Sequence, residues 1–401
     1  MEERPVLARD CNGAFLAAMK HWLRDDLQCA NHNTGKLLLI GLAGALVYNW
    51  RQWQRDKALL ALKVCPTKLA AFEDWPEIPH VSVLVAAWNE ARNIQAHINS
   101  FLNLRYPNKQ MVLVAGGEDG TFDLAIQYAG PNIIVLQQQV GEGKQHSLQR
   151  AFMQASGSIL YLTDADCLLD NRSFEACLHP LIFEGEKACN GISQPSKVQL
   201  REPFIVSQAA SQIYAALHLP AYAPGILGRN CALRRDALER SGCFEAFAST
   251  GTDYVLAKQL NRIGVRIRQN PHSCIVTEFP TSVHDYLQQQ DRWILNVLEH
   301  GWRYGAINEV KVSLFNSLVG LLMLGLPAAA LVFGRVCLAI WGALFFNAWL
   351  SRLRYWKVFS VFQSRQNPFA LVFQPIYLLI DFAAWALPIL ELLPFRRRRN
   401  W

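Results

Sequence analysis

The feature that most constrains the fold is a regular alternation of short apolar runs with longer amphipathic segments. The apolar runs are VSVLVAA, QMVLVAG, NIIVLQ and SILYLTDAD, and the segments between them include NEARNIQAHINSFLNL, TFDLAIQYA and KQHSLQRAFMQAS. Short runs rich in Val, Ile and Leu predict strands, whereas the periodicity of the intervening segments predicts helices. Strands that alternate with helices of this length predict an α/β domain with a mainly parallel sheet covered on both faces.

Carboxylates follow the last of these strands. Asp164 and Asp166 are spaced i, i+2, so in a pleated strand they would lie on one side and repel each other. A cation between them would remove the repulsion, but an exposed turn, where Asp is common, explains the pattern equally well. Asn89 and Glu90 follow the first strand in the same way. Ligands bind beyond the carboxyl ends of parallel strands, so this convergence favours a binding site.

The composition predicts a soluble domain joined to membrane segments. Of the 401 residues, 51% are hydrophobic and 18% are charged. The mean hydropathy of +0.08 is high for a soluble enzyme and low for a polytopic transporter. The ten cysteines show no CxxC spacing, which favours reduced core residues in a cytosolic compartment over a zinc site or a disulfide framework. No pattern typical of a cleavable signal peptide is present.

Three apolar blocks are candidates for contact with a membrane. Leu37–Trp50 is short for a span of about 20 residues, so it predicts a tilted span or a helix in the interface. Leu314–Leu350 predicts a hairpin of two short spans that turns at Gly334. Phe369–Phe395 contains Asp381, and its number of crossings stays open, as does the role of Asp381 as a partnered buried residue or a pathway residue.

The division that follows is an N-terminal region over residues 1–75, an α/β domain over 76–310 and a transmembrane region over 311–401. The net charge is +7, and basic residues gather where the apolar blocks end, at Arg51, Arg55, Lys57, Arg352, Arg354, Lys357 and Arg396–Arg399. Basic clusters in such places mark the cytoplasmic side of an inner or plasma membrane. No base-stacking aromatic residues are interleaved with them, which argues against nucleic acid as a partner. We therefore expect an integral membrane protein whose α/β domain is cytoplasmic.

Several short motifs occur in a fixed order along the α/β domain. They are Ala86–Glu90 (AAWNE), Gly116–Thr121 (GGEDGT), Asp164–Asp166 (DAD), Thr250–Asp253 (TGTD) and Gln289–Trp293 (QQDRW). In this order they resemble the family 2 glycosyltransferases, the membrane-bound group that includes cellulose, chitin and hyaluronan synthases. The resemblance covers roughly Val81 to Trp302. It implies a GT-A fold, which is Rossmann-like, and an inverting, metal-dependent displacement that makes a β-linkage.

The resemblance implies a role for each motif residue. Asp164 and Asp166 resemble the DxD that holds Mg²⁺ or Mn²⁺ against the donor diphosphate, an arrangement that stabilises a leaving group with two negative charges. Asp253 resembles the last residue of the TED motif, the catalytic base, although it also suits the start of the helix that follows. Gln289, Arg292 and Trp293 resemble QxxRW, in which the guanidinium meets diphosphate oxygens and the indole contacts the acceptor sugar. The indole also fits an interfacial aromatic residue.

The remaining donor and acceptor residues are assigned by the same resemblance. Lys144 heads a helix, where a cation and exposed N–H groups meet phosphate, and Asn89 and Glu90 flank the donor. Many members carry two aspartates where the second strand ends, but here the first carboxylates are Glu118 and Asp119. Either one of these contacts the nucleotide base or the backbone around Ala87 and Trp88 does, with UDP as the expected nucleotide. Arg229 and Asn230 are assigned to the acceptor side.

These features predict a hexosyltransferase that moves sugar from a nucleotide-sugar donor to a membrane-associated acceptor. A polysaccharide chain is the first expectation for the acceptor, and a lipid is the alternative. The small membrane region hardly encloses a sugar channel, so polymer synthesis would need an oligomer or an accessory channel partner. A non-catalytic scaffold with a glycosyltransferase-like fold is the hypothesis from a different class. The intact carboxylates argue against it.

Overall fold

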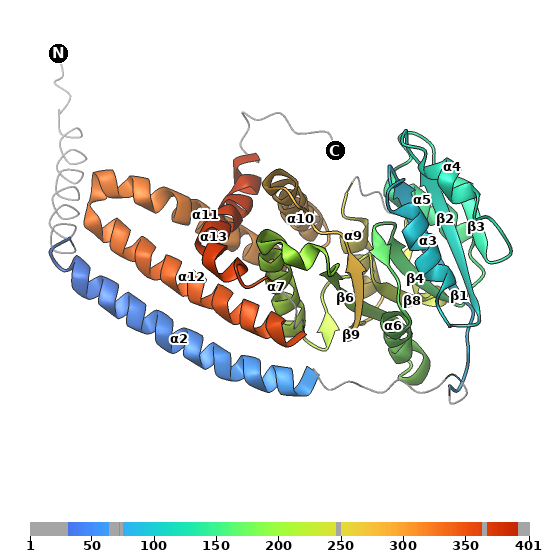
Figure 1. The fold of residues 1–401 in the computed structure, drawn as a ribbon, viewed down its shortest axis with the longest axis horizontal. Coiled ribbons are helices and arrows are strands. Elements are labelled where there is room, and N and C mark those ends of the chain that lie inside the picture. Colours follow the sequence, from blue (N-terminus) through green and yellow to red (C-terminus); the bar gives the residue numbers. More distant parts are fainter. Residues whose placement is uncertain (1–30, 64–71, 73–74, 246–249, 363–366, 392–401) are drawn as a thin grey trace, which may run out of the picture.

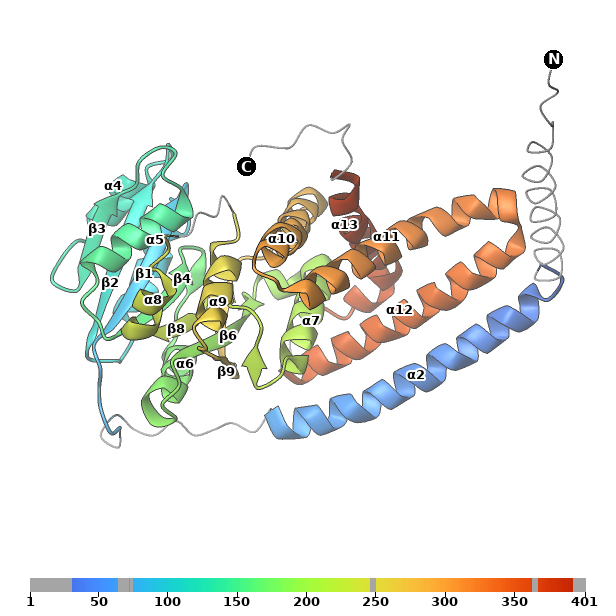
Figure 2. The same cartoon turned by 180° about the vertical axis from the view of Figure 1, so that it is seen from behind.

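The computed structural model describes residues 31–63, 72, 75–245, 250–362 and 367–391. Figures 1 and 2 show an elongated molecule, with the β-sheet and its covering helices at one end and a group of long helices at the other. Between the two lie α7 and α10. The predicted combination of an α/β domain and long apolar helices is confirmed.

The first half of the sheet has the predicted alternation. Its strands are β1 (Val81–Trp88), β2 (Lys109–Gly116), β3 (Ile133–Gln137) and β4 (Ile159–Asp164), and its helices are α3 (Ile94–Leu102), α4 (Thr121–Ile126) and α5 (Gly143–Gln154). β1 pairs in parallel with both β2 and β4, and β2 pairs in parallel with β3. The interiors of β1, β2 and β4 are buried, as the continuous apolar runs require.

The second half of the sheet is mixed, which differs from the mainly parallel sheet that the sequence predicts. Its elements are β5 (Cys167–Leu168), α6 (Asn171–Phe183), β6 (Ala188–Pro195), η2 (Gln199–Arg201), α7 (Pro203–His218), β7 (Tyr222–Ala223), β8 (Cys231–Arg234), α8 (Arg235–Ser241), α9 (Thr252–Arg262) and β9 (Ile267–Thr277). The order is β3-β2-β1-β4-β8-β6-β9-β5, and β7 pairs with β9. β8 lies antiparallel to both β4 and β6. A strand as short as β8 carries too little alternation in its sequence to reveal its direction.

Apolar cores on both faces hold the helices to the sheet. On one face Ile98 of α3 and Leu178 of α6 pack with Val83 of β1. On the other face Leu148 of α5 and Leu256 of α9 belong to the core that contains strand residues such as Leu84 and Leu160. This three-layer arrangement fixes the ends of β1 and β4, where the polar residues lie.

The long helices after the domain are α10 (Val283–Arg303), α11 (Ile307–Phe333), α12 (Arg335–Phe362) and α13 (Ala370–Glu391). Among the described residues, α11, α12 and α13 are the three helices that are long and apolar enough to cross a membrane. The predicted hairpin turns at Gly334, whose φ of 85° ends α11 directly before α12. The last apolar block forms one continuous helix, α13, through Pro375 and Pro388.

The N-terminal helix α2 (Thr34–Lys63) is 30 residues long, much longer than the predicted segment of residues 37–50, and it is not among the three candidate spans. It lies beside α12 and runs in the same direction (Figures 1 and 2). Asn49 donates to the side chain of Asn347 at 2.9 Å, and two turns further the fully buried Asp56 accepts from Arg354 at 3.1 Å. The helix therefore continues past the charge at residue 51, and the carboxylate of Asp56 further along it is paired with Arg354.

A buried polar cluster joins α10 to α12 and α13, two of the three candidate membrane spans. The hydroxyl of Tyr286 in α10 donates to Asp381 of α13 at 2.5 Å, and the same carboxylate is paired with Arg352 of α12. All three side chains are buried. Asp381 is thus a partnered buried residue, and the start of α10 is fixed to α12 and α13.

Candidate active site

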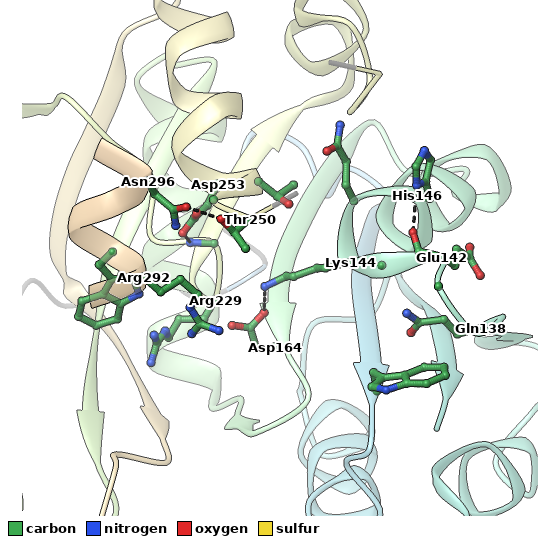
Figure 3. Close-up of a pocket in the computed structure, with 18 of the residues that line it drawn as sticks. Gln138, Glu142, Lys144, His146, Asp164, Arg229, Thr250, Asp253, Arg292 and Asn296 are labelled. Carbon is green, nitrogen blue, oxygen red and sulfur yellow. Dashed lines mark hydrogen bonds and ion pairs between the residues drawn. The ribbon is translucent and has the colours of Figure 1, made fainter. Parts of the chain in front are cut away.

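A cavity of about 790 Å³ opens beyond the carboxyl ends of β1 and β4 (Figure 3). The residues that line it come from separate parts of the chain and include Trp88, Gln138, Glu142, Lys144, His146, Asp164, Gly228, Arg229, Thr250, Gly251, Asp253, Arg292, Trp293 and Asn296. The position is the one at which open α/β sheets bind ligands. The predicted residues Lys144, Asp164, Arg229, Asp253, Arg292 and Trp293 are therefore brought together around one space.

Lys144 and Asp164 form an ion pair inside this cavity. The ammonium lies 2.5 Å from the carboxylate of Asp164, the last residue of β4 (Figure 3). Burial alone would raise the pKa of Asp164, but Lys144 and Arg229 outweigh burial and hold that pKa below its usual range. The carboxylate is consequently ionised at neutral pH, and the cation beside it lies within the space that a ligand would occupy.

Asp166 is placed differently from Asp164. It lies in the turn after β4, outside the residues that line the cavity, and its carboxylate accepts from Thr277 at 3.2 Å. Glu90 is close enough to Asp164 and Asp166 for their charges to affect its pKa. Burial raises the pKa of Glu90, and the charges of Asp166 and Asp164 raise it further. Negative charge therefore collects at the ends of β1 and β4.

The carboxylates at these strand ends fit a metal ion that arrives with its substrate. Among the described residues, no group of three or more His, Cys, Asp or Glu side chains is arranged to hold a metal by itself. Mg²⁺ is commonly bound by one or two carboxylates, with substrate phosphates and waters supplying the other ligands, and carboxylates suit Mn²⁺ equally. Asp164 lines the cavity and could supply one such ligand, and Asp166 lies in the turn directly after it.

Asp253 lines the same cavity from α9 and lies beside Thr250 and Asn296 (Figure 3). It is the second residue of α9, and its Oδ1 accepts from the backbone N–H of Tyr254 at 2.9 Å. Its Oδ2 lies 3.4 Å from the backbone nitrogen of Gly228, a long contact that leaves this oxygen able to take another partner. The two predicted roles of Asp253, as a helix-start residue and as a residue of the site, are thus compatible.

Gly228 allows the close approach of its loop to Asp253. A Cβ at this position would lie 2.9 Å from the Cβ of Asp253, closer than carbon atoms normally approach. We expect Gly228→Ala to displace the carboxylate and to lower kcat by about 10-fold, because small displacements of a reacting group are costly. The matched control is Gly225→Ala, where a Cβ meets nothing within 4 Å. Steady-state kinetics of both variants checks this, and equal rates would contradict it.

One face of α10 forms the part of the cavity wall next to the Thr250–Asp253 segment. Arg292, Trp293 and Asn296 all line the cavity, as their spacing on a helix allows. Gln289 lies one turn before Arg292, and its buried Oε1 has no hydrogen-bond partner within the described part of the chain. Gln289 is not one of the residues that line the cavity.

The other residues predicted for the site do not line this cavity. Asn89, with φ of 57°, accepts from the backbone N–H of Glu118, and Asp119 accepts from that of Ala91. These contacts hold the loops after β1 and β2 together. Asn230 is fully buried, and its side chain bonds to Tyr161, Ile192, and Ser273 in the core.

Sequence reasoning assigned no role to three residues around Asp253, although two of them lie within the motif Thr250–Asp253. Thr250, Gly251 and Asn296 line the cavity, and Asn296 is three residues beyond Trp293 on α10. The signal that could have found Asn296 is the helical spacing from Arg292, which places the two on one face. Nothing in the sequence alone connects Asn296 with Thr250, 46 positions earlier.

Comparison with known proteins gives the family. The family model described as "Glycosyltransferase like family 2" matches residues 79–296, which contain all of the cavity-lining residues. A hyaluronan synthase from Streptococcus pyogenes serotype M1 is 23% identical over 274 residues, which are 62% of this chain and 64% of that protein. The glycosyltransferase AglE from Haloferax volcanii is 37% identical over 95 residues, 22% of this chain and 31% of that protein.

A third relative and one solved structure complete the comparison. A poly-beta-1,6-N-acetyl-D-glucosamine synthase from Staphylococcus epidermidis is 27% identical over 97 residues, 24% of each protein. The chain therefore spans less than two thirds of the length of each of these relatives. The structure of the mannosyltransferase PcManGT from Pyrobaculum calidifontis, in complex with GDP-Man and Mn²⁺, matches 92% of this chain and all of that chain, with a TM-score of 0.53 and 18% identity. It shares the GT-A fold. With the family model covering more than half of its residues, the chain belongs to the family 2 glycosyltransferases.

Proposed function

We propose that this glycosyltransferase moves a hexose from a nucleotide-sugar donor to a membrane-associated acceptor, with a growing polysaccharide chain as the first candidate. One observation carries the proposal. Lys144, Asp164, Asp253 and Arg292 face a single cavity, and the α10 wall of that cavity leads within a few residues into the apolar helix α11. An acceptor held in the membrane could thus reach the carboxylate of Asp253.

The cations of the cavity would bind the donor diphosphate. Lys144, Arg229 and Arg292 line the space together, and a guanidinium offers paired donors to phosphate oxygens. When donor binds, we expect Lys144 to share its charge between Asp164 and the diphosphate. The charge that develops on the leaving group would then be met by groups already in place, which is an efficient form of catalysis. UDP is the nucleotide that we propose.

Asp253 is the proposed general base. Its free carboxylate oxygen would take the proton of the acceptor hydroxyl as that oxygen attacks the anomeric carbon. The bond from the anomeric carbon to the diphosphate breaks, and its electron pair leaves with the diphosphate. With the diphosphate held at Lys144 and Arg292, an acceptor hydroxyl that attacks the anomeric carbon from the face opposite the diphosphate would give inversion.

Asp164 and Asp166 are the residues that would hold a divalent metal, Mg²⁺ or Mn²⁺. When bound, it would neutralise charge on the leaving diphosphate. We expect EDTA to lower the release of nucleoside diphosphate by about 100-fold or more and added Mn²⁺ or Mg²⁺ to restore it, since several kcal/mol of charge stabilisation is removed. Turnover that is unchanged after exhaustive chelation would contradict this assignment.

Two acceptor classes have separate support. The polysaccharide acceptor is suggested by the names of two relatives, a hyaluronan synthase and a poly-beta-1,6-N-acetyl-D-glucosamine synthase. A lipid acceptor is favoured by large apolar side chains exposed where α10 leads into α11, namely Trp302 at 71%, Phe315 at 64% and Leu318 at 58%. Such a surface fits an acyl chain. The basic residues on α2 and α12 support a cytoplasmic position for the catalytic domain.

A labelling experiment tests the proposal and separates the acceptors. Detergent-solubilised protein would receive Mn²⁺, membrane lipid extract and a panel of radiolabelled nucleotide sugars, with Asp253→Asn beside it as a control. Alcohol-insoluble label would establish a polymer product, and label in the organic phase would establish a lipid acceptor. If no donor gives either label or free nucleoside diphosphate, the protein is a non-catalytic scaffold and the proposed function is wrong.

A further inference from the structure

The helix that carries Arg292 also holds the loop that precedes Asp253. Asn296 and His300 lie one and two turns beyond Arg292 on α10, and both are buried, with exposed fractions of 8% and 3%. Thr250 donates from its hydroxyl to Oδ1 of Asn296 at 2.5 Å (Figure 3). The carbonyl oxygen of Thr250 accepts from Nε2 of His300 at 2.9 Å. Two successive turns of α10 thus bind one residue through both its side chain and its backbone.

The residue between Thr250 and the start of α9 has little freedom to move. Gly251 has a φ of 75°, which side chains other than glycine rarely adopt. A Cβ at this position would lie 2.8 Å from Cγ of Asn296, so the loop backbone rests directly on that side chain. Asp253 follows two residues later. The position of Asp253 therefore depends on how α10 is rotated about its axis and shifted along it.

The rest of α9 has its own anchors. Tyr254 donates to Glu309 of α11 at 2.8 Å, and Lys258 is paired with the same carboxylate. The core residues Leu256 and Leu260 are also buried. Loss of a contact at Thr250 would consequently release the loop together with the first residues of α9, Thr252 and Asp253, and leave the later turns of α9 in place. The effect on catalysis is therefore separable from unfolding.

We propose that Asn296 and His300 are positioning residues that hold the Thr250–Asp253 loop against α10 and so set the distance between the general base and the diphosphate site. The inference rests on the proposed function, in which Asp253 is the base and Arg292 contacts the donor. Arg292, Asn296 and His300 lie one turn apart on the same helix. A shift of α10 would therefore move the donor-binding Arg292 and the loop that carries Asp253 together.

Variants of these residues test the proposal through kinetics. We expect Asn296→Leu and His300→Leu to lower kcat by about 10- to 100-fold, since a shift of roughly 1 Å in a reacting group has effects of that size. The Kd for nucleoside diphosphate should stay within about twofold, because donor contacts are retained. His300→Gln, which can place an N–H near the same point, should recover most of the rate. Glu299→Gln, exposed on the same helix, is the matched control and should behave as wild type.

A double-mutant cycle separates positioning from direct substrate contact, since Asn296 itself lines the cavity. If Asn296 acts through Thr250, Asn296→Leu will add little to the loss already caused by Thr250→Val. If the two losses multiply, or if the loss appears as a raised KM for the acceptor, Asn296 contacts substrate and the proposal is overturned.

Hydrogen exchange tests the same contact without any activity. Peptides covering residues 250–254 should exchange faster in Asn296→Leu than in wild type or Glu299→Gln. Unchanged exchange would overturn the inference whether or not a donor is found. A wild-type protein with no transferase activity, by contrast, would refute only the proposed function.

Discussion

Replacement of Asp253 by asparagine is expected to lower kcat for sugar transfer by about 1,000-fold, within the range that general bases contribute. An amide oxygen can still accept from the N–H of Tyr254, so the start of α9 should be retained. What is lost is the ability to take a proton. The measurement is the rate of nucleoside diphosphate release at saturating donor and acceptor, together with the Kd for the nucleotide.

The matched control for this variant is Asp236→Asn. Asp236 also lies in the first turn of a helix, α8, but it pairs with Lys187 and does not line the cavity. We expect near wild-type turnover from it. If Asp253→Asn retained a rate similar to that of Asp236→Asn, Asp253 would act only at the helix start and another group would be the base.

Removal of one partner from the buried pair of Arg352 and Asp381 is expected to have the largest effect on stability. Asp381→Asn would keep an acceptor for Tyr286 and leave the charge of Arg352 uncompensated. Breaking a buried ion pair in this way costs about 3–5 kcal/mol. We expect the Tm in detergent to fall by about 10 °C, as followed by intrinsic fluorescence.

A double variant distinguishes the charge effect from a packing effect. Replacement of both residues, as Arg352→Met with Asp381→Leu, removes the pair without leaving a buried charge and should restore much of the lost stability. A double variant that is less stable than either single variant would show that the pair stabilises the helices beyond the cost of its own burial.

The sequence predicted the part of the fold that follows from local patterns. β1, β2 and β4 are long apolar runs whose carboxyl ends meet, so the position of Asp164 at this edge of the sheet could be foreseen. Direction and register beyond β4 could not, because short strands such as β8 carry no clear period. The length of α2 was underestimated because the apolar run ends at the first charged residues. The helix continues beyond them, where Asp56 is paired with Arg354.

The sequence motifs pointed to charged residues of the candidate site, but they did not predict how side chains from different elements contact one another. Asp164 and Asp166 were expected to face one way, but the rule for pleated strands ends with β4 at Asp164, and Asp166 lies in the turn beyond. Asn230 follows the cavity residue Arg229 and yet bonds within the core. The contact between Thr250 and Asn296 depends on how α9 and α10 pack, which one sequence does not encode in any local pattern.

The cluster of Tyr286, Asp381 and Arg352 fixes one end of α10, so a tilt of the helix moves its other end. Its first turns are fixed to α12 and α13, and Asn296 lies about 15 Å along the helix axis from Tyr286. A tilt of α10 by about 5° about that fixed end would displace Asn296, and with it the loop of Asp253, by about 1 Å. Under the proposed function, with α12 and α13 in a bilayer, a change in bilayer thickness that tilts these helices would therefore reach the general base and alter turnover.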